Sequence, residues 1–427
     1  MKNILFFSKI NNLIDKIIYF LIILLPLSLI SGPFISELSI TIIVILFIYT
    51  SLKNRLFFFY TNIFSKIFGL FFIILILTSI LSIDPIISLT KTIFYFRFWI
   101  FSLSVWYIID KERDIFKHLI IILTLSFIIL VFDGYIQFLF KKNVLGWPIQ
   151  GSRVSSFFKE ELILGSYLSR LLPLLFALLI YNKNFDKNTL GYLFFLIIFI
   201  GVETLTFLSG ERVAFFYINF SALFLIVSMK KYKIFRTLSI LFSVILITFL
   251  VNLYPKSFDR MISETVKQLS WNAKLGSLNN EKYIFSFEHH NHYTSALKIF
   301  NDYKIFGAGP RMFRQLCNQK KYITSWESCS THPHNNYVQL LSETGLIGFI
   351  FVSIIFLYII YLILKHIFFK YRYKKIIYSD FQLSLISCIL ISIWPLVPTG
   401  GFFNNWLSII YFFPVGFLLY SLSKSKA

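Results

Sequence analysis

The chain has 427 residues, of which 57% are hydrophobic, 20% are aromatic and only 14% are charged. This composition is too apolar for a soluble globule and predicts a polytopic membrane protein. The net charge of +21 does not indicate nucleic-acid binding, because Lys and Arg cluster in the short gaps between apolar runs. We interpret it as the charge that orients the chain in a membrane.

Apolar runs long enough to cross a bilayer recur about twelve times, at about 20 residues per span. They predict an all-α fold, with helices that begin near Lys16, Glu37, Lys66, Thr92, Lys117, Leu162, Leu190, Val213, Phe235, Tyr337, Asp380 and Asn405. One long polar segment separates the ninth helix from the tenth. We therefore predict three regions: nine helices in residues 1–253, one large loop in 254–333, and three helices in 334–427.

The distribution of positive charge sets the expected orientation. One set of alternate gaps holds most Lys and Arg residues, including Lys53, Arg113, Lys231 and Lys370. We place these gaps and both termini in the cytoplasm, so the large loop faces outward. Residues 1–16 lack a continuous apolar core and a small-residue cleavage site, so we expect an interfacial or cytoplasmic lead.

The three cysteines fit this orientation. Cys317 and Cys329 both lie in the outward loop, whereas Cys388 lies in an apolar helix. In an oxidising outer compartment the loop pair could form a disulfide, and two free thiols are the alternative. Cys388 has the character of a small core residue.

Two outward gaps carry arginines that are candidates for binding an anion. Arg153 precedes Glu160 and Glu161 at a helix start, where carboxylates are favoured in any case. Arg212 follows a tight turn, L-S-G-E-R-V-A. A guanidinium binds phosphate bidentately and stays charged, which suits a pyrophosphate-bearing substrate. The plainer alternative for Arg212 is an arginine that reaches toward lipid headgroups.

Arg97 and Arg170 fall inside predicted spans. Charged side chains are costly in hydrocarbon, so such residues usually pair with each other or line a polar space. We expect each of them either to pair with a carboxylate or to approach an inner cavity. The sequence does not name their partners.

Five histidines of the long loop are expected near the membrane: His289, His290, His292, His332 and His334. Neither of the segments that hold them, 288–297 and 331–335, has the H-E-x-x-H arrangement of a metal site. The loop thiols lack C-x-x-C spacing, so we predict no metal. His334 stands between Pro333 and Asn335 at a helix start. It is suited to proton transfer or to hydrogen-bonding a hydroxyl or phosphate, and helix capping is the structural alternative.

Two further segments contain closely spaced glycines. Gly345 and Gly348 stand about one helical turn apart and would allow close helix packing or a bend at the start of a span. The turn G-A-G-P is followed by Arg311 and Arg314. It could bring backbone N–H groups and two cations toward an anion. It is not a phosphate-binding loop of the Walker A type, because no G-K-[ST] follows.

Together these segments resemble the O-antigen ligase family and the superfamily it shares with O-antigen polymerases and bacterial O-oligosaccharyltransferases. His334, Asn335, Gly345 and Gly348 match the family's H-[NSQ]-x9-G-x-x-G pattern, at the end of the large periplasmic loop. The segment 209–212 is similar to the family's S-x-R element, and 304–313 to its loop segment that ends in G-x-G-P.

The resemblance implies transfer of a glycan from undecaprenyl pyrophosphate to an acceptor, without metal or cofactor. A single displacement would invert the anomeric centre. The site would face the periplasm, at the bacterial inner membrane. Arg212 would bind the pyrophosphate, and His334 would act as the base or position the acceptor. Asn335, which matches the motif, would also contact substrate, and we expect the same of Arg153 from its position at an outward helix start.

One departure from the family pattern concerns the second phosphate contact. Many relatives have an arginine shortly before a W-x-x-A-L segment, where this chain has His289 or His290 before Tyr293 to Leu297. The resemblance therefore leaves the second contact to these histidines, or to Arg311 or Arg314.

The leading interpretation is an O-antigen ligase, which joins the glycan to lipid A-core. A polymerase that uses another lipid-linked repeat unit as acceptor is the first alternative, and protein O-glycosylation is the second. A transporter of lipid-linked glycan belongs to a different class. It would be expected to show repeats with broken helices in matching positions, and the sequence shows none.

Overall fold

The computed structural model describes residues 12–182, 188–255, 259–269 and 285–424, and over these residues the chain is helical, with isolated β-bridges and no strand. The elements are α1 (Leu13–Ile30), α2 (Pro33–Lys53), η1 (Phe57–Tyr60), α3 (Ile63–Ile80), α4 (Pro85–Thr92), α5 (Phe96–Lys111), α6 (Ile115–Phe140), η2 (Ser156–Phe158), α7 (Leu164–Tyr181), α8 (Thr189–Leu208), α9 (Arg212–Ser228), α10 (Lys233–Leu253), η3 (Asp259–Ser263), α12 (Glu264–Leu269), α13 (Phe287–Asp302), α14 (Phe313–Leu316), α15 (Asn336–Tyr373), α16 (Asp380–Ser392) and α17 (Asn405–Lys424). The predicted N-terminal lead lies mostly outside the described residues.

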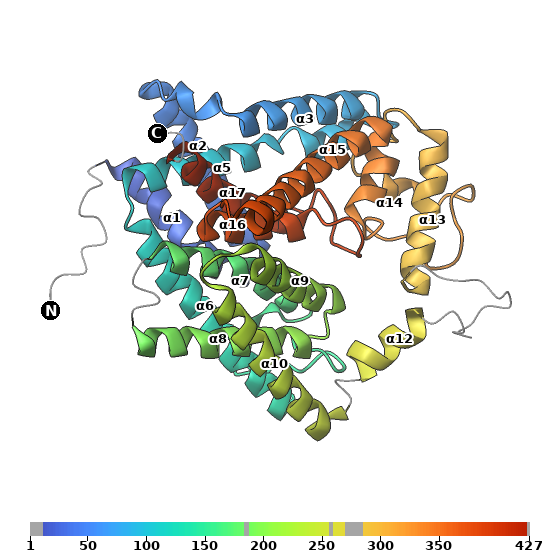
Figure 1. Ribbon diagram of the computed structural model, residues 1–427. Coiled ribbons are helices and arrows are strands. Elements are labelled where there is room, and N and C mark those ends of the chain that lie inside the picture. The colour runs from blue at the N-terminus through green and yellow to red at the C-terminus, as the bar shows by residue number, and fades with distance from the viewer. Residues whose placement is uncertain (1–11, 183–187, 256–258, 270–284, 425–427) are drawn as a thin grey trace.

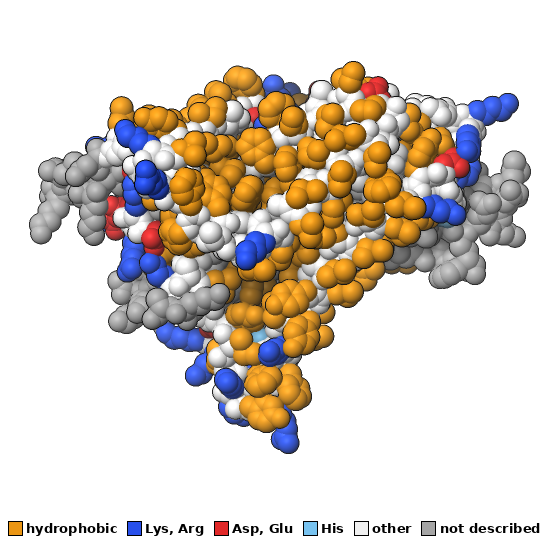
Figure 2. Space-filling view, turned by 90° about the horizontal axis from the view of Figure 1, so that it is seen from above, with side chains coloured by type: hydrophobic (Ala, Val, Ile, Leu, Met, Phe, Trp, Pro, Cys, Tyr) orange, Lys and Arg blue, Asp and Glu red, His pale blue; other side chains and the backbone are white. Residues whose placement is uncertain are grey.

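The prediction of an all-α polytopic membrane protein is confirmed. Within the described residues, ten helical segments are long and apolar enough to cross a membrane, with α4 and α5 forming one of them, and α9 and α16 are shorter apolar helices. Helices suit this environment because every backbone polar group is satisfied within the segment. Figure 2 shows one face of the molecule, where hydrophobic side chains cover most of the surface and Lys and Arg lie mainly at the margins.

One helix begins earlier than predicted. The fourth span was expected from Thr92, but its helical structure begins with α4 at Pro85. Asp84 caps this helix, because its carboxylate accepts a hydrogen bond from the Ile87 backbone N–H at 3.0 Å. A proline in the first helical turn after a capping aspartate is a common start signal.

The two ends of the helical bundle differ. At one end, ion pairs join the starts and ends of three helices: Lys111 of α5 to Asp15 of α1 at 2.6 Å, and Lys424 of α17 to Asp110 of α5 at 2.7 Å. The helices α12, α13 and α14 gather at the right of Figure 1, away from the start of α1 at the left. In the middle of the bundle, α7 packs against α16 and α9.

The long helix α15 is broken at Gly345, whose φ of 63° and ψ of −164° are not helical. A Cβ atom at this position would lie 2.3 Å from the Ile305 carbonyl oxygen and 2.5 Å from the Gly307 backbone nitrogen. The Leu346 N–H donates to the Lys304 carbonyl at 2.8 Å. The break therefore lets the loop of the G-A-G-P turn pack directly on the start of the helix.

We expect Gly345→Ala to lower the free energy of unfolding by about 3 kcal/mol, because it adds both a left-handed backbone strain and a collision with backbone atoms. Denaturant titration of the purified protein in mixed micelles measures this change. The control is Gly69→Ala in α3, where a Cβ meets no atom within 4 Å and the change should not exceed about 1 kcal/mol. Equal stability of both variants would contradict the packing role of Gly345.

Cys317 and Cys329 are joined by a disulfide, with their Cα atoms 5.1 Å apart. The bond connects the residue that follows α14 to the segment that leads toward His332. Cys388 is free and buried in α16. The disulfide thus fixes the loop on which two of the candidate histidines stand.

Candidate functional site

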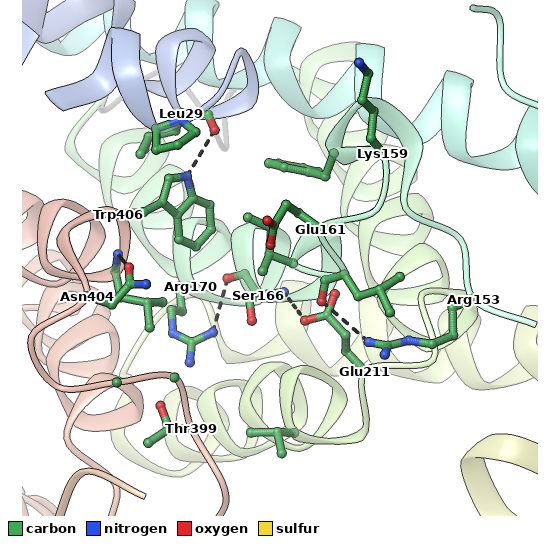
Figure 3. A pocket seen from close by; sticks show the side chains of 18 of the residues that line it. Leu29, Arg153, Lys159, Glu161, Ser166, Arg170, Glu211, Thr399, Asn404 and Trp406 are labelled. Atoms are coloured by element: carbon green, nitrogen blue, oxygen red, sulfur yellow. Dashed lines mark hydrogen bonds between the residues drawn. The ribbon is translucent and has the colours of Figure 1, made fainter. Parts of the chain in front are cut away.

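A cavity of about 900 Å³ lies at the bundle end where α1 finishes and where α2, α7, α9 and α17 begin. This is the end opposite the ion pairs of Asp15 and Lys424. One wall is apolar, and there the Trp406 indole N–H donates to the Leu29 carbonyl at 3.1 Å, so that α17 is tied to α1 (Figure 3). The opposite wall carries most of the charged groups.

The turn between α8 and α9 organises the arginines of that wall. The Arg153 Nε–H donates to the Ser209 carbonyl at 3.4 Å, and the Arg260 Nε–H donates to the Gly210 carbonyl at 3.3 Å. Gly210 has a φ of +68°, and a Cβ there would lie 2.9 Å from Arg153 Cγ and 3.0 Å from Arg260 Nε. Only glycine leaves room for both side chains, so arginines from two other segments pack on the turn that precedes Arg212.

The two residues that follow Gly210 have different roles. The Glu211 carboxylate accepts from the backbone N–H groups of Gly165 at 2.6 Å and Ser166 at 3.0 Å, at the start of α7. It therefore anchors a helix N-terminus, where a carboxylate is favoured. Arg212, the first residue of α9, donates from Nη1 to the Thr265 hydroxyl at 3.3 Å and lines the cavity.

The charges of this wall act on one another. Burial lowers the pKa of Arg153, Glu211 opposes the shift, and Arg260 and Arg212 add to it. Burial also raises the pKa of Glu211, against the pull of Arg153 and of the backbone donors. Of the carboxylates near these guanidinium groups, Glu211 is engaged by backbone N–H groups and Glu264 lies 3.8 Å from Arg260. A cluster of guanidinium groups is an arrangement that favours binding of a multiply charged anion.

Arg97 and Arg170, the two arginines inside predicted spans, were each expected to pair with a carboxylate or to approach a cavity, and the structure shows one of each. Arg97 pairs with Glu37 at 2.7 Å. Arg170, in α7, lines the cavity, donates to the Ser166 carbonyl at 3.4 Å and lies over the ring of Tyr217 with its guanidinium carbon 4.8 Å from the centroid. Arg170, Ser166, Glu211 and Arg153 follow one another across the cavity in Figure 3.

Four histidine rings lie close together, and three of them, those of His289, His332 and His334, line the cavity. The ring centroid of His334 lies 4.2 Å from that of His332, 5.2 Å from that of His292 and 5.6 Å from that of His289. His334 has a left-handed backbone, with φ of 56°, and its carbonyl accepts from the Thr399 N–H at 2.8 Å. The imidazole of His334 makes no hydrogen bond with a described residue, so its nitrogens are open to a ligand.

These histidines are held in their neutral form. Burial lowers the pKa of His334 to about 4, with His292 as a further cause, and lowers that of His289 to about 4, with His334, His292 and Arg212 adding to the shift. Burial also lowers the pKa of His332 to about 3, and His334 adds to this effect. A neutral imidazole can accept a proton, which is the requirement for a general base near neutral pH.

The lowered pKa values predict a loss of stability in acid. Below about pH 6.5 the unfolded histidines bind protons and the folded ones do not, so stability falls as the pH drops from about 6.5 to about 4 and this effect then levels off. Melting temperatures of the purified protein at pH 7.5, 6, 5 and 4.5 measure it. The double variant His289→Gln/His334→Gln should show a smaller fall over this range, and an unchanged fall would contradict neutral folded histidines.

The predicted site residues divide between several places. His334, Arg212, Arg153 and His289 line the first cavity, whereas His290 lines neither this cavity nor a second one beside Arg311. Asn335 caps α15: its side-chain oxygen accepts from Tyr337 and Val338, and its amide donates to the Pro395 carbonyl at 2.8 Å. This geometry gives Asn335 a positioning role for the segment that bears His334.

Arg311 and Arg314 do not lie beside Arg212. They line a second cavity of about 340 Å³, whereas Arg153 and Arg260 line the first cavity together with Arg212. His332, Gly401, Asn404 and Trp406 are among the residues that line both cavities. Among the described residues, no group of three or more His, Cys, Asp or Glu is arranged to hold a metal ion.

Fold and site together define a polytopic membrane protein whose main cavity has an apolar wall, a wall of arginines and a margin of neutral histidines. Residues 193–353, from α8 into α15, match the family model described as O-antigen ligase. This match confirms the resemblance to the O-antigen ligase family, whose members are glycosyltransferase-like enzymes. A comparison with curated proteins finds no significant match.

Proposed function

We propose that the protein is an O-antigen ligase, which transfers a glycan from undecaprenyl pyrophosphate to lipid A-core at the periplasmic face of the bacterial inner membrane. The observation that carries this proposal is the grouping of Arg153, Arg212 and Arg260 with the open imidazole of His334 around one cavity. Guanidinium groups suit a diphosphate leaving group, and a neutral imidazole suits a hydroxyl nucleophile.

The orientation is part of the proposal. The cavity lies at the end of the bundle opposite the start of α1 and the end of α17. If both termini are cytoplasmic, as the positive charges of the cytoplasmic gaps favour, the cavity faces the periplasm. The apolar wall at Leu29 and Trp406 then supports the first units of the polyprenyl chain where it leaves the bilayer.

In the proposed reaction, a hydroxyl oxygen of the acceptor attacks the anomeric carbon of the lipid-linked sugar. The bond from that carbon to the phosphate oxygen breaks, and the diphosphate leaves with the electron pair. Arg153, Arg212 and Arg260 stabilise the negative charge that develops on it. His334 accepts the hydroxyl proton, and a single displacement of this kind inverts the anomeric centre.

The polymerase remains the second candidate, because it uses the same donor and differs only in its acceptor. The superfamily includes both activities, and the donor chemistry at the arginines is the same for each. Protein O-glycosylation is a more distant alternative. A transporter would need no group that accepts a hydroxyl proton, and the four-histidine cluster favours an enzyme over it.

The test uses the full-length protein, reconstituted with a glycan on undecaprenyl pyrophosphate. Lipid A-core is the acceptor in one reaction, and a second portion of lipid-linked repeat is the acceptor in the other. Glycan on lipid A-core, seen as a mobility shift and by mass spectrometry, supports the ligase. A ladder on the polyprenyl carrier supports the polymerase, and no transfer to either acceptor would contradict both.

A further inference from the structure

The second cavity differs from the first in its composition. It is lined by Lys91 of α4, by Arg311 just before α14, by Arg314 of α14, and by the starts of α2, α15 and α17. Its three cations come from two parts of the chain that are more than 200 positions apart. Since neither segment belongs to the arginine wall of the first cavity, the proposed function leaves these cations unexplained.

The cations of the second cavity form no ion pair with a described residue. Neither the Arg311 nor the Arg314 guanidinium makes a side-chain hydrogen bond or an ion pair with a described residue. The Lys91 ammonium donates to the Asn405 side-chain oxygen at 3.0 Å, which is a neutral partner. Three cations that face one concave space without a carboxylate bound to any of them attract an anion.

The two carboxylates that line this cavity are already engaged. Glu37 pairs with Arg97, which lies outside the cavity lining, at 2.7 Å. Glu343 accepts hydrogen bonds from the Gln339 amide at 2.9 Å and from the Phe313 backbone N–H at 3.2 Å. Its interaction with Arg314 is a longer-range electrostatic attraction without a hydrogen bond. The positive charge of the cavity is therefore only partly offset.

His332 connects the second cavity to the reaction centre. It lines both cavities, and its ring centroid lies 4.2 Å from that of His334. Its Nε2 atom is buried and is not in hydrogen-bonding geometry with any described residue, although the Thr399 backbone lies near the ring. A sugar that reaches from the second cavity toward His334 would pass this nitrogen, which can bond one of its hydroxyls.

We propose that the second cavity binds an anionic substituent of the acceptor, a phosphate or a carboxylate on a sugar close to the attacked hydroxyl, through Arg311, Arg314 and Lys91. This inference rests on the proposed glycan transfer and names a chemical requirement of its acceptor. The bound anion holds the acceptor in the second cavity, beyond His332, so that the acceptor hydroxyl reaches His334. The donor diphosphate meanwhile binds to Arg153, Arg212 and Arg260 in the first cavity. Two separate cationic sites keep donor and acceptor from exchanging places.

The experiment uses the full-length reconstituted protein and three preparations of lipid A-core: intact, enzymatically dephosphorylated, and with its carboxyl groups reduced to alcohols. Initial rates give the KM for acceptor and for donor. We expect removal of the recognised anion to raise the acceptor KM about tenfold and to leave the donor KM unchanged, as loss of charge-assisted hydrogen bonds would do. The preparation that shows this effect identifies the anion as phosphate or carboxylate.

The matching variant is Arg311→Gln/Arg314→Gln. It should raise the KM for the intact acceptor about tenfold and bind intact and anion-depleted acceptors alike. The control is Lys320→Gln, an exposed cation of the same loop that lines neither cavity. The proposal is overturned if all three preparations behave alike with wild type, or if the double variant changes the donor KM instead.

Binding of the same three core preparations, measured by calorimetry without donor, separates this proposal from the proposed function. If no acceptor is glycosylated but binding still depends on the anion and on Arg311 and Arg314, the anion site stands and the ligase assignment fails. If transfer occurs but neither binding nor KM depends on the anion, the ligase assignment stands and the anion site is rejected.

Discussion

Replacing His334 with glutamine is expected to lower the rate of glycan transfer about 1,000-fold, which is the range that a positioned general base contributes. Glutamine keeps much of the size and the hydrogen-bonding capacity of the imidazole but cannot take up a proton. The effect should fall on kcat, since the donor diphosphate binds to the arginines. Single-turnover transfer to lipid A-core measures the chemical step directly.

The control for this variant is His290→Gln. His290 stands on the same loop helix as His289 but lines neither cavity, so its replacement should change the rate less than about threefold. The neutral state of His334, with its pKa lowered by burial to about 4, predicts that wild-type activity shows no loss centred on pH 6.5. His334→Gln with more than a tenth of wild-type activity would remove the histidine from the chemical step.

Replacing Arg212 with glutamine is expected to lower kcat/KM about 100-fold to 1,000-fold, the effect of removing one positioned donor from a developing oxyanion. Arg212→Lys should recover only part of the loss, because an ammonium keeps the charge but not the bidentate geometry. Arg260→Gln should cost less, because Arg153 and Arg212 remain. Initial rates over a range of donor concentration separate donor binding from the chemical step.

The control for the arginine variants is Arg113→Gln. Arg113 is exposed in the turn between α5 and α6, at the end of the bundle opposite the cavity. Its replacement removes the same charge and should leave kcat/KM unchanged. If Arg113→Gln and Arg212→Gln reduced transfer equally, the effect would belong to net charge and not to the cavity.

The all-helical, multi-pass fold could be predicted because a bilayer imposes a length and an apolar composition on every span. The two family motifs that contain Arg212 and His334 predicted these residues as part of the site, and both line the first cavity. Helix capping was considered for His334, but the structure gives the cap to the next residue, Asn335, and asparagine is a common N-cap. Its interpretation as a substrate contact came from the family resemblance alone.

Arg260 and Arg170 were not placed in the site because their roles depend on tertiary packing. Arg260 reaches Gly210, 50 positions away, and nothing near Arg260 in the sequence indicates that contact. Arg170 had two possible surroundings, a carboxylate or a cavity, and only the packing of α7 decides between them. The separation of Arg311 and Arg314 from Arg212 likewise follows from where the loop after α13 folds, which no local pattern encodes.

The most direct test of the account is a cryo-electron microscopy structure of the protein in nanodiscs with undecaprenyl pyrophosphate. The proposed function predicts density for the diphosphate against Arg153, Arg212 and Arg260 in the first cavity, with the polyprenyl chain leaving along the wall of Leu29 and Trp406. Diphosphate density in the second cavity, beside Arg311 and Arg314, would contradict it, because the leaving group would then stand where the acceptor is expected.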